Sequence, residues 1–77
     1  MKTGDKKTAM PGALTTIDEA RDYATSIACL RRLPVHIFPV PEGTRAYEYG
    51  FRFGTCPDDE RAAYESDGAK IIETVNP

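Results

Sequence analysis

The sequence predicts an α+β fold with the element order α-β-β-α-β, in which a three-stranded mixed sheet carries two helices on one face. Two observations lead to this prediction. Aromatic and non-aromatic residues alternate without a break over residues 46–54, which is the two-residue repeat of a β-strand. Apolar residues over 17–30 recur instead at the repeat of an α-helix. The matching apolar faces of this strand and this helix are expected to form the core.

The length of 77 residues predicts one small domain. We expect residues 1–13 to form a flexible tail, because lysines, glycines and a Met-Pro-Gly step occur there without periodicity. Residues 14–77 are expected to form a single small α+β domain. Such a domain has little mass for a deep enzyme pocket, so its size favours a binding role without a cofactor or a small-molecule substrate.

The sequence contains no apolar stretch long enough to span a membrane, and no apolar signal-peptide core follows its polar opening. These features predict a cytoplasmic protein with no membrane partner. The two cysteines are too few for a disulfide scaffold, and a reducing compartment would keep both as thiols.

The first helix is predicted to begin after Thr16 and to end before Pro34. Thr16 and Glu19 have the spacing of a capping box, and proline disfavours helix in the residue before it. Cys29 lies on the polar side of this helix, so we expect it to be exposed and not paired with Cys56. The apolar side of the helix carries Ile17, Ala20, Tyr23, Ala24, Ile27, Ala28 and Leu30.

The first strand is predicted over residues 34–41, with Val35 and Ile37 on one face and His36 on the other. Its three prolines remove three backbone donors, which favours an edge strand. Its short apolar run favours a buried strand instead. A turn at residues 42–45 is then expected to return the chain as an antiparallel hairpin.

The second strand, residues 46–54, is predicted to form the centre of the core. The alternation puts four of the seven aromatic residues on one face, namely Tyr47, Tyr49, Phe51 and Phe53. We expect this aromatic row to face the helices. The opposite face carries Glu48 and Arg52, and it is expected to remain open as a second candidate surface for a partner.

A second helix is predicted from Pro57 to about Ser66. Proline suits the first helical position, and the three acids that follow it suit the positive end of the helix dipole. Asp67-Gly68 is expected to end this helix. The last strand is expected at residues 69–75, and a right-handed crossover would make it parallel to the aromatic strand. The sequence does not decide whether the first strand lies between these two strands.

Cys56 is the best single candidate for chemistry, because it lies just before the predicted start of the second helix, where backbone N–H groups favour a thiolate. The acids that follow it oppose that effect, so a structural thiol is favoured over a nucleophile or redox group. His36 is the only histidine, and on a strand it is more often a packed ring than a general base. A metal site would need Cys29, His36, Cys56 and a carboxylate to converge, and none of them has ligand spacing.

The negative charge is concentrated in the second part of the chain. Residues 1–53 carry eight Lys and Arg against six Asp and Glu, whereas residues 54–77 carry two against six. The acids on the predicted second helix and its end are Asp58, Asp59, Glu60, Glu65 and Asp67. They are either solvating charges or an anionic face for a basic groove on a partner.

A different class of function would use the basic residues. In this alternative the protein is a nucleic-acid-binding accessory protein, and phosphate contacts come from the lysines of the tail and from Arg31, Arg32, Arg45 and Arg52. A base-stacking role for the aromatic row is less favoured, because the row has few interleaved basic residues.

In its size, mild acidity, α/β make-up and lack of catalytic motifs, the chain resembles small proteins encoded by phages and mobile elements, and among them the anti-CRISPR inhibitors. This resemblance implies a non-catalytic inhibitor that binds a larger protein or nucleoprotein complex, such as a CRISPR effector complex. It implies that the inhibitor occupies a positively charged nucleic-acid-binding site of a host nuclease. The matching residues would be Asp58, Asp59 and Glu60 together with Glu65 and Asp67.

Overall fold

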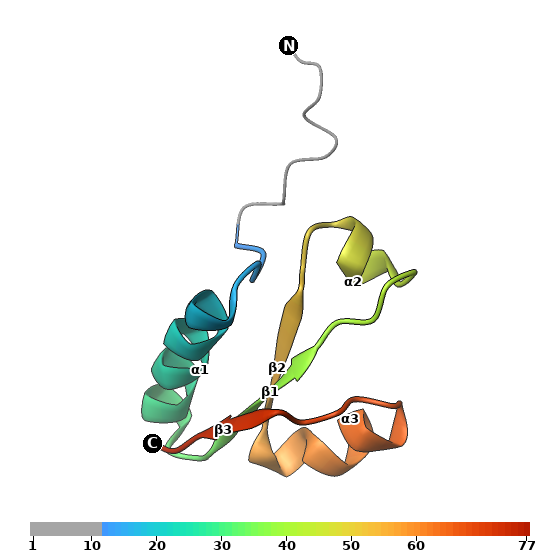
Figure 1. The fold of residues 1–77 in the computed structure, drawn as a ribbon. Coiled ribbons are helices and arrows are strands. Elements are labelled where there is room, and N and C mark those ends of the chain that lie inside the picture. The colour runs from blue at the N-terminus through green and yellow to red at the C-terminus, as the bar shows by residue number, and fades with distance from the viewer. Residues whose placement is uncertain (1–11) are drawn as a thin grey trace.

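The computed structural model describes residues 12–77 and contains an α+β fold built on a three-stranded sheet (Figure 1). The strands are β1 (Val35–Pro39), β2 (Phe53–Pro57) and β3 (Glu73–Val75), in the order β2-β1-β3. Both pairings are antiparallel, so the predicted mixed sheet is wrong. β2 and β3 run in the same direction, but β1 separates them and they do not pair. Most of the predicted tail, residues 1–11, lies outside the described residues.

β1 is the central strand of the sheet, so it is a buried strand and not the edge strand that its prolines favour. Pro34 and Pro41 lie outside the strand, and Pro39 is its last residue. β3 pairs only with the part of β1 from Val35 to Ile37, so it does not reach the position where Pro39 lacks an N–H. The prolines therefore flank the central part of β1 without interrupting it, and residues 35–37 are all buried.

Helix α1 (Ile17–Arg31) begins and ends where the sequence predicts. The Thr16 hydroxyl accepts from the Glu19 N–H at 3.1 Å, and the Glu19 carboxylate accepts from the Thr16 N–H at 3.2 Å, which completes the capping box. Three alanines on the buried side have no exposed surface, and they allow the helix to pack closely on Val35 and Ile37. These alanines are Ala20, Ala24 and Ala28.

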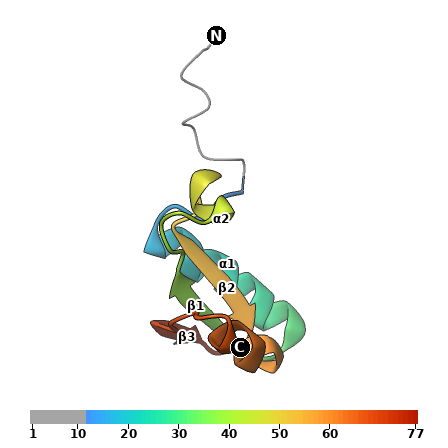
Figure 2. The same cartoon turned by 90° about the vertical axis from the view of Figure 1, so that its right-hand side faces the viewer.

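The predicted aromatic strand is wrong over most of its length. Residues Arg45–Glu48 form a short helix, α2, whose cap is the Thr44 hydroxyl, an acceptor for the Tyr47 N–H at 3.3 Å. The chain then turns at Gly50, which has a φ of 103°. Local capping and this turn therefore override the two-residue alternation, and of the four aromatic residues only Phe53 lies in a strand. Figures 1 and 2 place α2 at the end of the fold opposite to α3.

The predicted second helix begins later than expected. β2 extends to Pro57, a 3₁₀ turn η2 follows over Asp58–Glu60, and α3 covers Arg61–Ser66. Cys56 is therefore a strand residue and not the residue before a helix. The reason is the register of the sheet, which pairs Val35 with Pro57 and so extends the hairpin into the predicted helix.

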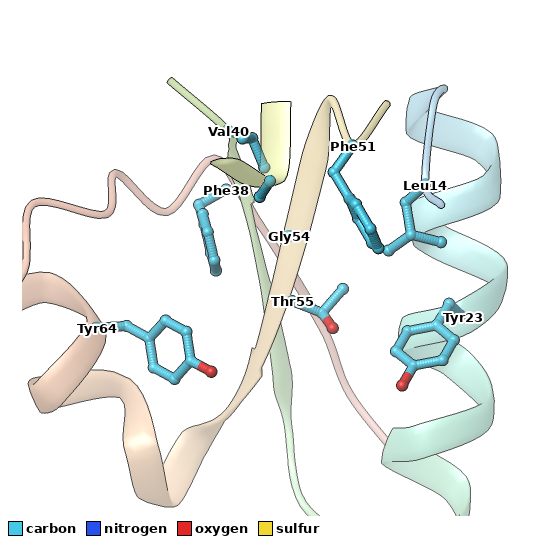
Figure 3. Close-up of a pocket in the computed structure, with 9 residues that line it drawn as sticks. Leu14, Tyr23, Phe38, Val40, Phe51, Gly54, Thr55 and Tyr64 are labelled. Atoms are coloured by element: carbon cyan, nitrogen blue, oxygen red, sulfur yellow. The ribbon is translucent and has the colours of Figure 1, made fainter. Parts of the chain in front are cut away.

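The two longer helices do not share one face of the sheet. α1 covers the side of Val35 and Ile37, whereas Phe38 points to the opposite side, where its ring lies 5.6 Å from that of Tyr64 in α3. Figure 3 shows β2 between Tyr64 and the α1 residue Tyr23. α1 and α3 therefore stand on either side of β2, and the edge of β2 lies between them.

Candidate binding surface

A hollow with a volume of about 300 Å³ lies along the edge of β2 that does not face β1. We call it the edge groove (Figure 3). Gly54 and Thr55 of β2 form its floor. Its lining is mainly apolar and comes from the segment before α1, from α1, β1, α2, the loop before β2 and α3. The lining residues other than the floor are Leu14, Tyr23, Phe38, Val40, Ala46, Phe51 and Tyr64.

The edge groove has two walls, one on each side of β2 (Figure 3). Leu14, Tyr23 and Phe51 form the wall on the α1 side. Phe38 and Tyr64 form the wall on the α3 side, with their ring planes inclined at 46°. Tyr23 keeps 49% of its surface exposed, so this aromatic side chain of α1 remains accessible. A mainly apolar groove with a few polar groups is the usual form of a binding site.

Gly54 permits the position of the Phe38 ring. The two residues are cross-strand partners, and a Cβ on Gly54 would lie 2.5 Å from the Phe38 Cζ atom. No Cβ atom approaches a ring so closely without displacing it. A glycine in a strand interior often marks such a close approach, and here it allows Phe38 to reach Tyr64 and complete the wall.

A smaller hollow of about 220 Å³ lies on the other side of that wall. It shares Phe38 and Tyr64 with the edge groove, and Asp67 is the only charged residue in its lining. Its remaining lining residues are Pro39, Pro41, Thr44, Gly68 and Ala69. Asp67, one of the five predicted acidic residues, therefore lines this second hollow.

All five predicted acidic residues are exposed, and all belong to η2, α3 or the residue after α3. We call residues 58–67 the acidic segment. Asp59 contacts Arg31 at 3.2 Å, and Glu65 contacts Arg61 at 3.2 Å. Within residues 12–77, Glu60 and Asp67 form no ion pair. The sequence therefore identified an exposed acidic segment, but not the ion pairs that offset part of its charge.

Asp58 has a structural role that the sequence did not reveal. Its Oδ1 atom accepts from Nε2 of His36 at 2.7 Å, and Nδ1 of His36 lies 2.8 Å from the hydroxyl of Thr74. His36 is only 2% exposed. Both ring nitrogens are therefore engaged, as buried polar groups require, which fits the expectation of a packed histidine. Thr74 could not be identified in advance, because its position depends on the register between β1 and β3.

Glu48 and Arg52 do not lie on an open sheet face, because the strand that would have carried them does not form. Glu48 is the last residue of α2, and Arg52 precedes β2. The Arg52 guanidinium lies 3.7 Å from the centre of the Tyr47 ring and donates to the Tyr47 carbonyl at 2.9 Å. Arg52 thus holds α2 and the loop before β2 together.

The two thiols differ in their exposure. Both are free, as predicted, and Cys29 is exposed whereas Cys56 is buried. Burial raises the pKa of the Cys56 thiol, and the charge of Glu60 adds to this effect. Because the thiolate is the reactive form, Cys56 is poorly suited to act as a nucleophile.

We therefore expect iodoacetamide to modify Cys29 alone in the folded protein, and both cysteines after unfolding in urea. Intact-mass measurement would show one adduct and then two, and peptide mapping would assign the first adduct to Cys29. A first adduct on Cys56, or a cross-linked pair of cysteine peptides, would contradict the arrangement of the thiols described above.

Within residues 12–77, no group of three or more His, Cys, Asp or Glu side chains is placed to hold a metal ion. In the same part of the chain, every helix is too short or too polar to cross a membrane. Comparisons of the chain with protein-family models, with curated proteins and with solved structures found no match. Function is therefore inferred from the residues of this chain alone.

Proposed function

We propose that this protein is a non-catalytic inhibitor of the anti-CRISPR type, which binds a larger nucleoprotein complex and occupies a basic nucleic-acid-binding surface of its nuclease. It would act in the cytoplasm of the cell that makes it. The observation that supports the proposal is the acidic segment, in which five exposed carboxylates occur within ten residues. Opposite charges on two surfaces speed their association and exclude unsuitable partners.

The ion pairs of the acidic segment leave it available to a basic partner. In the contacts of Arg31 with Asp59 and of Arg61 with Glu65, all four side chains are between 42% and 55% exposed. Such exposed pairs contribute little to stability, and a basic surface can compete for their carboxylates. Asp58 differs, because its partner His36 is buried. The residues offered to a partner are therefore Asp59, Glu60, Glu65 and Asp67.

The structure gives less support to a protein that binds nucleic acid directly. Of the arginines in that alternative, Arg31 contacts Asp59 and Arg52 stacks on Tyr47. The lysines of the tail lie outside the described residues. The exposed carboxylates of the acidic segment would also repel a phosphate backbone, so the acidic segment favours a protein surface as the target.

The proposal can be tested with purified, guide-loaded CRISPR effector complexes and a cleavage assay on target DNA. We expect the protein to block cleavage at a near-stoichiometric ratio, and prebound target DNA to prevent its binding. The double variant Glu60→Lys/Asp67→Lys should bind about tenfold more weakly or worse, because close charge pairs across an interface become repulsive. Both positions lack an ion pair within residues 12–77, so the fold should tolerate the change.

The matched control is Asp22→Lys/Glu42→Lys, which changes the net charge equally at two exposed positions outside the acidic segment. This control should inhibit almost as well as the parent protein. Equal inhibition by the two double variants would show that the acidic segment is only a solvated surface. Uninhibited cleavage in every complex tested would disprove the proposed function.

A further inference from the structure

β2 is an edge strand whose even-numbered residues direct their backbone N–H and C=O groups toward β1. Beyond one end of β2, the Val40 N–H donates to the Arg52 carbonyl at 3.0 Å, and beyond the other end the Asp58 N–H donates to the Pro34 carbonyl at 2.9 Å. Hydrogen-bonded pairs alternate along an antiparallel ladder, so the even-numbered residues between these two also face β1. The odd-numbered residues of β2 consequently direct their backbone groups away from the sheet.

Among these odd-numbered residues, Thr55 is the one whose backbone N–H and C=O both lack a partner within residues 12–77. The Phe53 N–H already donates to the Leu14 carbonyl at 3.2 Å, and Pro57 has no N–H. Thr55 therefore presents both an N–H and a C=O at the free edge, on the floor of the edge groove. Unpaired groups of this kind are a template for another strand, unless neighbouring residues block it.

The walls of the edge groove match the shape of such a strand. An added strand would turn successive side chains to opposite sides of the sheet. One set would face Tyr23 and Phe51 on the α1 side, and the other would face Phe38 and Tyr64 on the α3 side (Figure 3). All four of these side chains are aromatic, so each wall favours an apolar contact.

We propose that the edge groove binds a short extended segment of a partner protein as an added β-strand. Thr55 pairs with the backbone of the segment, and its alternate apolar side chains contact the two walls. The edge groove shares Tyr64 with the acidic segment but includes none of its carboxylates, and the proposal does not rest on the inhibitor function.

A separate segment fits the edge better than a second copy of the chain does. If two β2 strands paired in antiparallel fashion about Thr55, Pro57 of the second copy would lie opposite Phe53. That position is already occupied by Leu14, whose carbonyl accepts from the Phe53 N–H. A partner segment needs to pair only beside Thr55 and Pro57, and it can leave the sheet before it reaches Leu14.

The test is a display library of random nine-residue peptides, selected against the full-length protein. We expect the enriched peptides to carry apolar residues at every second position. A synthetic peptide from the enriched set should slow hydrogen exchange of the Thr55 amide in the ¹⁵N-labelled protein. This measurement uses the parent chain and does not depend on the folding of any variant.

Two variants then test whether the peptide binds in the edge groove. Tyr23→Lys puts a charge into the α1 wall, and it should weaken peptide binding by about tenfold or more. Tyr49→Lys is the matched control, because Tyr49 has the same exposure of 49% but does not line the groove. The affinity of the Tyr49→Lys variant for the peptide should stay within about twofold of that of the parent protein, since residues outside a contact patch have little effect.

Several outcomes would overturn the proposal. They are a library without enrichment, enriched peptides without alternating apolar residues, an unprotected Thr55 amide, and equal binding by the Tyr23→Lys and Tyr49→Lys variants. A dimer in sedimentation measurements that Tyr23→Lys dissociates would instead assign the groove to a second copy. Circular dichroism of both variants confirms that each has the parent fold.

Discussion

Replacement of Ile37 by alanine is expected to remove a large part of the stability of this domain. Ile37 has no exposed surface, and among residues 12–77 it is the largest fully buried side chain, followed by Val35 and Cys56. An Ile→Ala change in a core costs about 2–5 kcal/mol. A domain of this length has a total stability of roughly 4–12 kcal/mol. Urea denaturation followed by circular dichroism would measure the loss.

Two further variants test whether the core is placed correctly. Leu30→Ala removes a side chain that is 79% exposed, and its effect should stay within about 0.5 kcal/mol. Phe51→Ala removes a partly buried side chain of the edge groove, so it should cost less than Ile37→Ala. The aromatic alternation of the sequence predicts the reverse order. A larger loss for Phe51→Ala would therefore show that the core forms around the aromatic residues after all.

The first helix could be predicted from the sequence because its signals are local. A capping box, an apolar stripe and a proline after its end all act within a few residues, and α1 begins and ends accordingly. The buried positions of Ala20, Ala24 and Ala28 follow from the same repeat. Ile17 and Ile27 also pack against the core, whereas Tyr23 and Leu30 of the predicted apolar side are exposed.

The aromatic alternation does not produce a strand over residues 46–52, because two local signals favour a helical turn and a loop there. Thr44 caps a helical turn, and Gly50 adopts a positive φ that ends it. Together they replace a strand with α2 and a loop. Because residues 46–52 are not part of the sheet, their alternating side chains do not form two sheet faces. Arg52 stacks on Tyr47 instead of lying on an open sheet face.

The candidate surfaces differ in how far the sequence could reveal them. The acidic segment was predictable, because its carboxylates are neighbours along the chain. The edge groove was not, because it requires the strand order β2-β1-β3 and the placement of α1 and α3 on either side of β2. Tyr23 and Tyr64, which are distant in the sequence, line the same groove only in the folded protein. The bond between His36 and Asp58 likewise depends on long-range register.

Gly54→Ala is the second substitution with a large expected effect. The new Cβ would lie 2.5 Å from Cζ and 2.6 Å from Cε1 of Phe38, so the ring must move away from β2. Phe38 contacts Tyr64, and the displaced ring would therefore also disturb the α3 wall of the edge groove. Overpacking of this kind typically costs about 1–3 kcal/mol.

A double-mutant cycle with Phe38→Val identifies the cause of that cost. In the Phe38→Val background the ring is absent, so Gly54→Ala should cost much less than in the parent, and the two substitutions should be coupled by about 1 kcal/mol or more. Urea denaturation of the parent, the two single variants and the double variant gives this coupling. Equal costs in both backgrounds would mean that the glycine is needed for its backbone alone. Because Gly54 and Phe38 are direct cross-strand partners, a strong coupling would also confirm the register between β1 and β2 on which the floor of the edge groove depends.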